Sequence, residues 1–404
     1  MTTFSTHTAS RHHAAWGAIF SMALGVVVLI ASEFMPVSLL TPVAQDLGIS
    51  QGQAGQAISV SGFFAVLTSL LNTPLTGRFD RKKVLIAFTL LLTISGLTVT
   101  FAPDGLIFIV GRALLGVAIG GFWSMSTATI MRLAPPHAVA KGLALINGGN
   151  ALAATIAAPL GSFLGQYIGW RGAFFIVVPL AVAAFIWQWR ALPSLPAQAD
   201  NQRASPLRLL GLSHVAAGMA AILALFMGQF AIFTYLRPFM ESVTGASVSE
   251  LSFILLLLGA AGLAGTWSIG LLLQTHLFRW LILIPLAMAA IGALLIWQGR
   301  SLLITGALLA AWGLVSTPAP VAWGLWLSRA LPESAEAGGG LMVAVIQLAI
   351  TLGAALGGEL FDAVGWWSPF AFGLALLLLS ALFAVLASRR YLHSDAASAE
   401  ASPT

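Results

Sequence analysis

Long apolar runs alternate with short polar segments along the whole chain. A run of about 20 apolar residues can cross a bilayer as a helix, which satisfies its own backbone hydrogen bonds in lipid. Runs of this kind begin near Trp16, Gly52, Val84, Gly105, Val139, Trp170, His214, Ser247, Phe278, Leu302, Ala335 and Trp367. The pattern predicts an all-α membrane protein with twelve transmembrane helices.

Composition agrees with this prediction. Only 8% of the 404 residues are charged and 59% are hydrophobic, whereas a soluble domain carries roughly 25% charged residues. The chain contains no cysteine, which excludes disulfides and thiolate metal sites. The first run leads straight into further spans without a small-residue cleavage site, so we interpret it as a transmembrane helix and not as a signal peptide.

The distribution of lysine and arginine predicts the orientation of the spans. With the N-terminus inside, 14 of the 18 basic residues face the cytoplasm, and the opposite side keeps Arg171, Arg237 and Arg300. Arg112 lies within a span. Both termini are therefore expected to be cytoplasmic. The net charge of +5 does not indicate nucleic-acid binding, because the basic residues are dispersed among short loops.

The second half of the sequence repeats the first at an offset of 196 positions. The matched pairs are Glu33 with Gln229, Phe34 with Phe230, Pro42 with Pro238, Pro136 with Pro332, Gly142 with Gly338, Gly161 with Gly357, Gly169 with Gly365, Trp170 with Trp366 and Phe174 with Phe370. So many matches at one offset indicate an internal duplication. An offset of six spans preserves orientation, so the two halves are expected to be parallel repeats.

Such repeats predict two pseudo-symmetric six-helix bundles that alternate in access about a site near the bilayer midplane. We expect the bundles at 15–191 and 213–389. A polar linker at 192–212, interpreted as a disordered connector on the cytoplasmic side, joins them. Cytoplasmic tails at 1–14 and 390–404 complete the predicted organisation.

One carboxylate interrupts the first apolar run. Glu33 lies about 25 Å along the predicted helix from Trp16, in the outer part of the membrane, and Pro36 leaves the carbonyl of Ser32 without a helical donor. A membrane-buried carboxyl can bind and lose a proton as its access to water changes. Gln229, at the matching position, keeps the shape but cannot titrate. Proton coupling is one interpretation of Glu33.

Two alternatives to proton coupling stay open. Glu33 is also explained by solvation in a wet outer mouth, or by contact with a substrate hydroxyl. The carboxylates near the outer end of the eleventh span, Glu359 and Asp362, are expected to be solvated.

The loop at 74–83, PLTGRFDRKK, resembles the cytoplasmic signature loop of the major facilitator superfamily, in its twelve-helix drug/proton antiporter branch. The resemblance implies that Arg78, Asp80 and Arg81 pin helix ends through ion pairs that break in another conformation. Gly77 stands where the family has an acidic residue, and Asp80 is the candidate substitute. A positive-inside anchor explains the basic residues equally well.

Two further motifs carry the resemblance. The segment 111–116, GRALLG, is similar to the branch's intramembrane arginine motif, and 157–161, AAPLG, is similar to its antiporter motif. The likeness implies that Arg112 acts with Glu33 in proton coupling and that Pro159 and Gly161 form a hinge or seal. An arginine in a span costs on the order of 3 kcal/mol on insertion scales, so Arg112 should find a partner inside the bundle. A role in holding helices together is the alternative for each motif.

The superfamily's cavity-facing spans contain aromatic and amide side chains. The resemblance places the substrate site at Phe34, Trp123, Ser126, Asn147, Asn150, Gln229, Phe230, Phe233, Tyr235, Trp312, Trp323 and Gln347. Rings can stack on a planar base and amides can pair with its edges, so this set suits a planar, uncharged ligand. Some of these aromatic residues are equally explained as interfacial side chains.

Segments 36–42, 120–126, 228–235 and 343–349 are similar to those of the bacterial purine ribonucleoside efflux permeases. This likeness implies efflux of inosine- and guanosine-like nucleosides across the bacterial inner membrane in exchange for protons. The expected partners are the solute, protons and the lipid bilayer, with no nucleic acid and no cofactor besides the proton motive force, and the expected state is a monomer. Efflux of sugars or drugs is the alternative.

Other classes fit the sequence less well. An ATP-driven pump needs a phosphate-binding G-x-x-x-x-G-K-[ST], which the sequence lacks. The histidines are scattered at tails and loop edges without a catalytic constellation, so an enzyme is not expected. A channel would not need paired halves, and a receptor would have no use for Glu33 and Arg112, although the sequence excludes neither.

Overall fold

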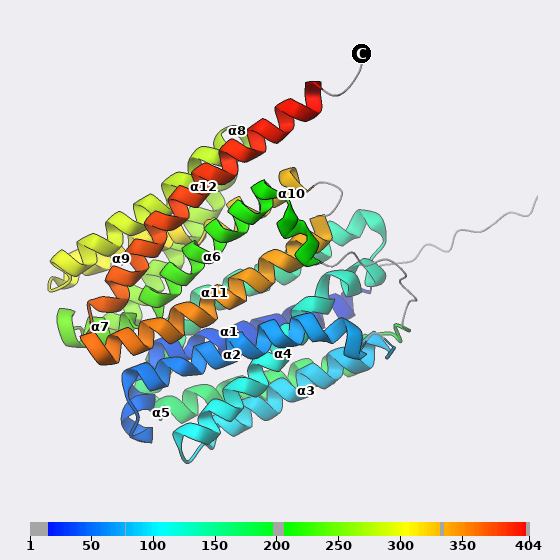
Figure 1. The fold of residues 1–404 in the computed structure, drawn as a ribbon. Helices are drawn as coiled ribbons and strands as arrows, with labels where there is room; N and C mark the ends of the chain where they lie inside the picture. Colours follow the sequence, from blue (N-terminus) through cyan, green and yellow to red (C-terminus); the bar gives the residue numbers. More distant parts are fainter. Residues whose placement is uncertain (1–14, 77, 197–205, 332–334, 401–404) are drawn as a thin grey trace, which may run out of the picture.

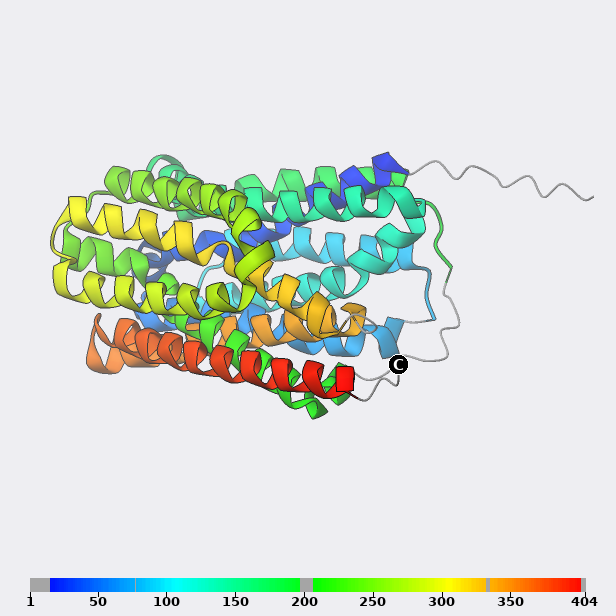
Figure 2. The same cartoon turned by 90° about the horizontal axis from the view of Figure 1, so that it is seen from above.

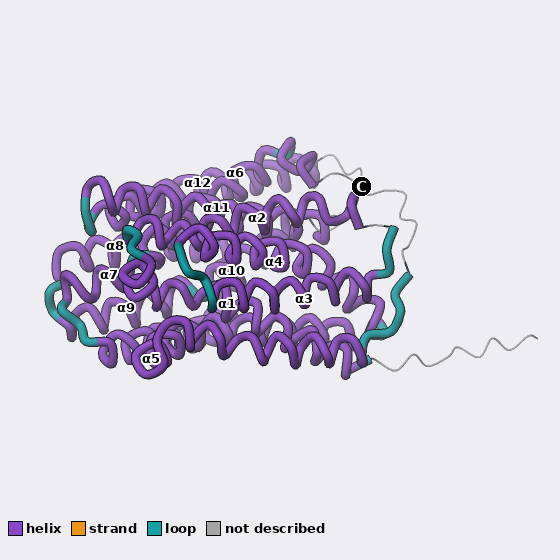
Figure 3. The backbone as a smooth tube through the Cα atoms, turned by 90° about the horizontal axis from the view of Figure 1, so that it is seen from below, coloured by secondary structure: helices purple, strands orange, loops and turns teal. Residues whose placement is uncertain are grey.

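The chain is all-helical throughout the part that the computed structural model describes, residues 15–76, 78–196, 206–331 and 335–400 (Figure 1). The predicted N-terminal tail, Gly77, the middle of the linker at 197–205 and Pro332 lie outside the described residues. The long helices run roughly along one direction with short connections between them (Figure 3). The all-helical prediction is therefore confirmed.

The described elements follow one another in a simple order. They are α1 (Trp16–Leu47), α2 (Gln51–Thr76), α3 (Arg81–Thr100), α4 (Gly105–Leu133), α5 (Pro136–Ala191), η1 (Pro206–Gly211), α6 (Ser213–Thr234), α7 (Leu236–Phe239), η2 (Met240–Thr244), α8 (Val248–Gln298), α9 (Leu302–Ser316), α10 (Ala319–Ala330), α11 (Ala335–Val364) and α12 (Ser368–Glu400).

Eleven segments of the described chain are long and apolar enough to cross a membrane, and one of them contains two crossings. The segment Lys141–Ala191 has 51 residues, which at 1.5 Å per residue is more than twice the roughly 30 Å of a hydrocarbon core. It bends at Gly169, whose φ of 72° and ψ of 167° are not helical. Helix α8 bends at His276, whose φ of −135° and ψ of 39° are also not helical. Twelve crossings follow, in agreement with the sequence pattern.

Packing within each half of the sequence is extensive. Helix α1 lies along α5 and α2 along α4, while α6 lies along α12 and α8 along α9. Contacts between the first and second halves run mainly through two seams, α2 with α11 and α5 with α8. Figure 1 shows the blue-to-teal helices below the green-to-red helices, and Figure 2, seen from above, shows green-to-red helices in front of part of the first half.

The internal repeat is visible in local geometry. Gly169 and its match Gly365 both have positive φ, 72° and 116°. Directly after them, Trp170 packs edge-on against Phe174 with ring centroids 6.0 Å apart. Trp366 packs against Phe370 in the same manner at 6.4 Å. The offset of 196 positions therefore marks structurally equivalent turns in the two halves.

We expect Gly169→Ala to lower the stability of the protein by about 1–2 kcal/mol, because an L-residue is strained at positive φ. Nothing lies within 4 Å of the position that the new methyl group would take, so the loss would come from the backbone alone. Thermal unfolding in detergent measures it.

The matched control is Gly148→Ala, which also meets open space but keeps a helical backbone. This variant should be neutral or slightly stabilising, because alanine favours a helix over glycine. Equal stability of the two variants would contradict the role assigned to the Gly169 turn.

Candidate functional site

Glu33 is buried near the seam between the two halves. Its side chain is 2% exposed, and its Oε1 has no hydrogen-bond partner among the described residues. The Gln347 amide of α11 and the charge of Arg112 on α4 both interact with the carboxyl. A carboxyl with an unused oxygen in a buried position can accept a proton or a hydrogen bond from a ligand.

The guanidinium of Arg112 hydrogen-bonds to a carbonyl of α1 that lacks a helical donor because of the first proline in that helix. Pro36 has no N–H, so the carbonyl of Ser32, four residues earlier, lacks its helical donor. Arg112 Nη1 donates to that oxygen at 2.6 Å. Arg112 is 1% exposed, as expected for an intramembrane arginine with partners inside the bundle.

The remaining bonds of Arg112 also go to neutral oxygens. Nη2 donates to the Glu33 carbonyl at 3.2 Å and to Ser61 Oγ at 3.3 Å. Nε donates to the Ala57 carbonyl of α2 at 3.2 Å. Arg112 therefore joins α4 to α1 and α2 through backbone and hydroxyl groups, and it leaves the Glu33 Oε1 free.

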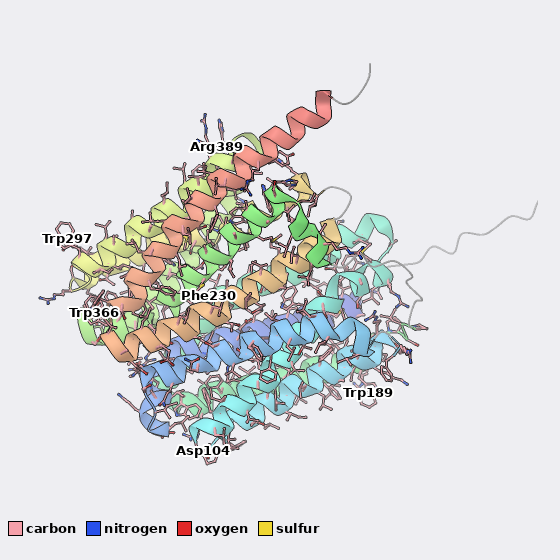
Figure 4. The ribbon with its side chains drawn as sticks, in the orientation of Figure 1. Asp104, Trp189, Phe230, Trp297, Trp366 and Arg389 are labelled. Atoms are coloured by element: carbon pink, nitrogen blue, oxygen red, sulfur yellow. The ribbon has the colours of Figure 1, made fainter. Side chains whose placement is uncertain are left out.

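Two aromatic residues at matching positions of the repeat meet across the seam, and one of them follows Glu33 in the chain. Phe34 and Phe230 stack with ring centroids 5.8 Å apart and an interplanar angle of 26°, and Phe233 packs edge-on against Phe230 at 6.0 Å. Figure 4 shows Phe230 near the middle of the molecule. The neighbouring Gln229 and the Gln347 of α11 each bury a side-chain oxygen without a hydrogen-bond partner among the described residues.

The other predicted substrate residues of the first half lie in varied surroundings. Trp123 and Asn150 are half-buried, and Asn147 is exposed. The Asn147 amide donates to the Leu143 carbonyl at 3.0 Å. Ser126 is buried and donates to the Trp123 carbonyl at 3.1 Å. The hydrogen bonds of Asn147 and Ser126 stay within their own helices and do not reach Glu33 or the two stacked rings.

Three predicted substrate residues of the second half are fully buried in protein. Trp312 and Trp323 belong to the hydrophobic core of that half, and Trp323 packs edge-on against Trp326 with centroids 5.3 Å apart. Tyr235 packs with Leu40, two turns beyond Glu33 on α1, and donates its hydroxyl to the Ala354 carbonyl at 2.8 Å. All three side chains therefore make their contacts with other groups of the protein.

The signature loop is organised around Asp80. Its carboxylate caps α3 by accepting from the Lys82 N–H at 2.8 Å, and it also accepts from Ser194 Oγ at 2.5 Å and from the Leu195 N–H at 2.9 Å. Burial opposes ionisation of Asp80, but these hydrogen bonds outweigh it and lower the pKa of the carboxyl. The Arg81 N–H donates to the Leu195 carbonyl at 2.9 Å.

The start of the linker is therefore ordered, because Asp80 and Arg81 fix Ser194 and Leu195 against the start of α3. This corrects the interpretation of that stretch as a disordered connector. Arg78 is exposed.

Pro159 and Gly161 lie in α5, which packs along α1. A methyl group on Gly161 would come within 2.7 Å of Ser38 Oγ, so the glycine permits this close helix contact.

Asp362 departs from the sequence-based expectation. It is exposed but not merely solvated, since it accepts hydrogen bonds from Ser50 Oγ and from the Gly52 N–H at the start of α2.

The pairing of Arg112 with a proline-freed carbonyl was not foreseen, although the sequence contained its signal. A proline four residues after a carbonyl marks an unpaired acceptor, and an intramembrane arginine marks an unpaired donor. Their meeting required the packing of α4 against α1.

Comparison with known proteins agrees with this architecture. Residues 22–342 match the family model described as Major Facilitator Superfamily. The chain is 48% identical to the "Transcription regulatory protein OpdE" of Pseudomonas aeruginosa, over 96% of this chain and 98% of that protein. It is 45% identical to the "Purine ribonucleoside efflux pump NepI" of Escherichia coli K12 and of Shigella sonnei, over 91% of this chain and 93% of each pump.

Solved structures show the same fold at low sequence identity. A bacterial homologue of the human lysosomal transporter Spinster, in an inward-facing and unoccupied conformation, superposes with a TM-score of 0.72 over 93% of this chain and 96% of that one. A D-xylose–proton symporter superposes with a TM-score of 0.71 over 91% of this chain and 97% of that one. Both are 16% identical in sequence.

We expect Arg112→Ala to destabilise the protein by about 2–3 kcal/mol, because it leaves the buried Ser32 carbonyl without a donor. Adding Pro36→Ala should recover part of this loss, since residue 36 would then supply the missing N–H. Thermal unfolding of the four proteins of this double-mutant cycle measures the coupling. Strictly additive effects would contradict the assigned pairing.

Proposed function

Because the chain belongs to the Major Facilitator Superfamily, we propose that it exports purine ribonucleosides, such as inosine and guanosine, in exchange for protons by alternating access. Membership of this family implies a small-molecule substrate and embedding in a membrane. The efflux pumps that share 45% identity over nearly the whole chain support the choice of cargo. The buried carboxyl, amides and stacked rings support a small organic solute.

The proposed arrangement is two pseudo-symmetric six-helix bundles, 15–191 and 213–389, joined by the linker at 192–212. The repeated turns at Gly169 and Gly365 support the symmetry. The excess of lysine and arginine on one side supports cytoplasmic termini, and the bacterial relatives support an inner-membrane location. We propose that one such chain, as a monomer, forms a complete transport path.

The observation that carries the proposal is the free oxygen of Glu33. Arg112 fixes α1 by binding backbone oxygens, so the carboxyl is held in place while its Oε1 has no hydrogen-bond partner among the described residues. In the proposed cycle, Glu33 takes a proton when one side of the membrane is accessible and releases it to the other side. Gln229 keeps the matching position in the second half without titrating.

The substrate is proposed to bind between the halves, beside Phe34 and Phe230. A purine ring can stack on these aromatic faces, and the oxygens of Gln229 and Gln347 can accept hydrogen bonds from its N–H groups. Trp123, Ser126, Asn147 and Asn150 are proposed to complete the path on the side of the first half.

Sugar or drug efflux is the alternative cargo within the same fold. The D-xylose–proton symporter supports only the fold, because its sequence identity is 16%. The regulatory name of the Pseudomonas relative belongs to that protein, and no site described above favours a regulatory role in this chain. A transport assay that includes a pentose and a lipophilic cationic dye distinguishes these cargoes from nucleosides.

We expect Glu33→Gln to abolish proton-driven exchange while nucleoside binding is retained, because glutamine keeps the hydrogen-bonding shape but cannot titrate. Proteoliposomes with an imposed pH gradient, acid inside, measure this. Inosine, guanosine, a pentose and a lipophilic cationic dye are added in turn, and a pH-sensitive fluorophore reports proton movement.

Glu359→Gln is the matched control, because Glu359 is an exposed carboxylate and its loss should leave exchange unchanged. Uphill nucleoside transport by Glu33→Gln would remove Glu33 from the coupling role. A response of the unmodified protein to the dye or pentose instead of nucleosides would change the cargo. No response to any of the four by folded protein would reject the proposed function.

We expect Phe230→Ala to weaken nucleoside binding by about 5- to 150-fold, the range typical of losing one base–aromatic stack. Titration of radiolabelled inosine against purified protein measures this affinity. Phe175→Ala, at an exposed aromatic position of α5, should leave the affinity unchanged. Equal losses in the two variants would indicate a general folding effect and not a stacking contact.

A further inference from the structure

The second proline of α1 leaves another carbonyl without its helical donor. An arginine from the other half of the protein hydrogen-bonds to this carbonyl. Pro42 leaves the Ser38 carbonyl without a helical donor. Arg237 of α7 donates Nη1 to that oxygen. Its Nε also donates to Glu241 Oε1 at 2.7 Å, and the side chain is 6% exposed.

The two arginine–proline pairings differ in what they connect. Arg112 and the Ser32 carbonyl both belong to the first half, so their bond can persist while the halves move. Arg237 belongs to the second half and the Ser38 carbonyl to the first, so their bond must break if the halves separate at this end.

Tyr235 fills the same seam with its ring. The side chain is fully buried, and a methyl group on Gly55 of α2 or on Gly358 of α11 would overlap its hydroxyl oxygen. The ring stacks on Phe361 with centroids 5.3 Å apart. A tyrosine of the second half therefore lies in a notch that exists because two helices carry glycine there.

Three hydrogen bonds extend the closure along α2 and α11. Asp362 accepts from Ser50 Oγ and from the Gly52 N–H, the latter at 3.0 Å. The Gln56 amide donates to the Ala355 carbonyl at 3.4 Å. All of these bonds, like that of Arg237, join one half to the other.

We propose that Arg237 and Tyr235 form the closing elements of a gate at this end of the transport path, which is the outer end in the orientation proposed above. Arg237 is the latch and Tyr235 is the plug. This inference rests on alternating access as the proposed function. Tyr235 thereby takes a gating position in place of the substrate contact predicted from the sequence.

Because Pro42 leaves the Ser38 carbonyl without a helical donor, the hydrogen bond from Arg237 stabilises the closed state more than the open state. While the gate is closed, the Ser38 carbonyl is dry and depends on Arg237 as its donor. Once the halves separate, water can reach that carbonyl and replace the guanidinium. Removing Arg237 therefore raises the free energy of the closed state more than that of the open state, and the population shifts toward opening.

Spin-label distance measurements in lipid nanodiscs test the gate directly. The chain has no cysteine, so Pro103→Cys and Arg300→Cys introduce two unique labels at exposed positions of this end, one on each half. The unmodified background should give mainly the short, closed separation. Arg237→Gln should raise the ratio of long to short separations about tenfold.

Adding Pro42→Ala tests whether the Ser38 carbonyl is the group that Arg237 satisfies. It gives residue 42 an N–H that can occupy the Ser38 carbonyl, so the double variant Pro42→Ala/Arg237→Gln should return toward the closed distribution. Arg171→Gln is the matched control, because Arg171 lies in the first half and bonds there to Asp46 and the Ala102 carbonyl. It should leave the distribution unchanged.

The plug is tested separately by Gly55→Ala, which should displace Tyr235 and also populate the long separation. Gly340→Ala, where a methyl group meets open space, is its control. Unchanged distances in folded Arg237→Gln and Gly55→Ala would overturn the gate. Equal opening by Arg171→Gln, or by Arg237→Gln with and without Pro42→Ala, would overturn the latch.

These distances are recorded without substrate or proton gradient, so they do not depend on the cargo. A gate that opens as expected while the transport assay is silent would reject the proposed export and keep the gate. Exchange of nucleosides for protons with unaltered distances would keep the export and reject the gate.

Discussion

In a bilayer, a backbone carbonyl that loses its helical donor has no water to replace it, and the arrangement of α1 follows from this constraint. Pro36 and Pro42 each free one carbonyl in the same helix. Arg112 reaches the first from α4, and Arg237 reaches the second from α7. A buried arginine needs acceptors as much as these carbonyls need donors, so each pairing satisfies two groups that would be costly alone.

The distribution of these bonds separates a fixed region from a movable one. Arg112 holds α1, α2 and α4 together within the first half, and it places Glu33 without occupying the free carboxyl oxygen. Arg237, Tyr235 and Asp362 bridge the two halves instead. The carboxyl can therefore stay in register with its own half while contacts to the other half form and break.

The internal repeat is symmetric in its scaffold and asymmetric in its chemistry. The turns at Gly169 and Gly365 match, and so do the aromatic pairs that follow them. Glu33 faces no second carboxylate at the matching position, because Gln229 stands there. In the proposed cycle the first half carries the charge change, while the second supplies neutral hydrogen bonding and the Phe230 ring that stacks on Phe34.

Hydrophobic periodicity, the 196-residue offset and the position of each proline were readable in the sequence, because span length, repetition and a missing N–H are local properties of the chain. They determined the helical architecture, the duplicated turns and which carbonyls of α1 would lack donors. Glu33, Arg112 and the Phe34–Phe230 pair were also identifiable as candidates. Only the tertiary structure decided which arginine meets which carbonyl, that Tyr235 enters a glycine notch, and that Asp362 bonds to α2. Those outcomes depend on contacts between helices far apart in sequence, and no local pattern specifies them.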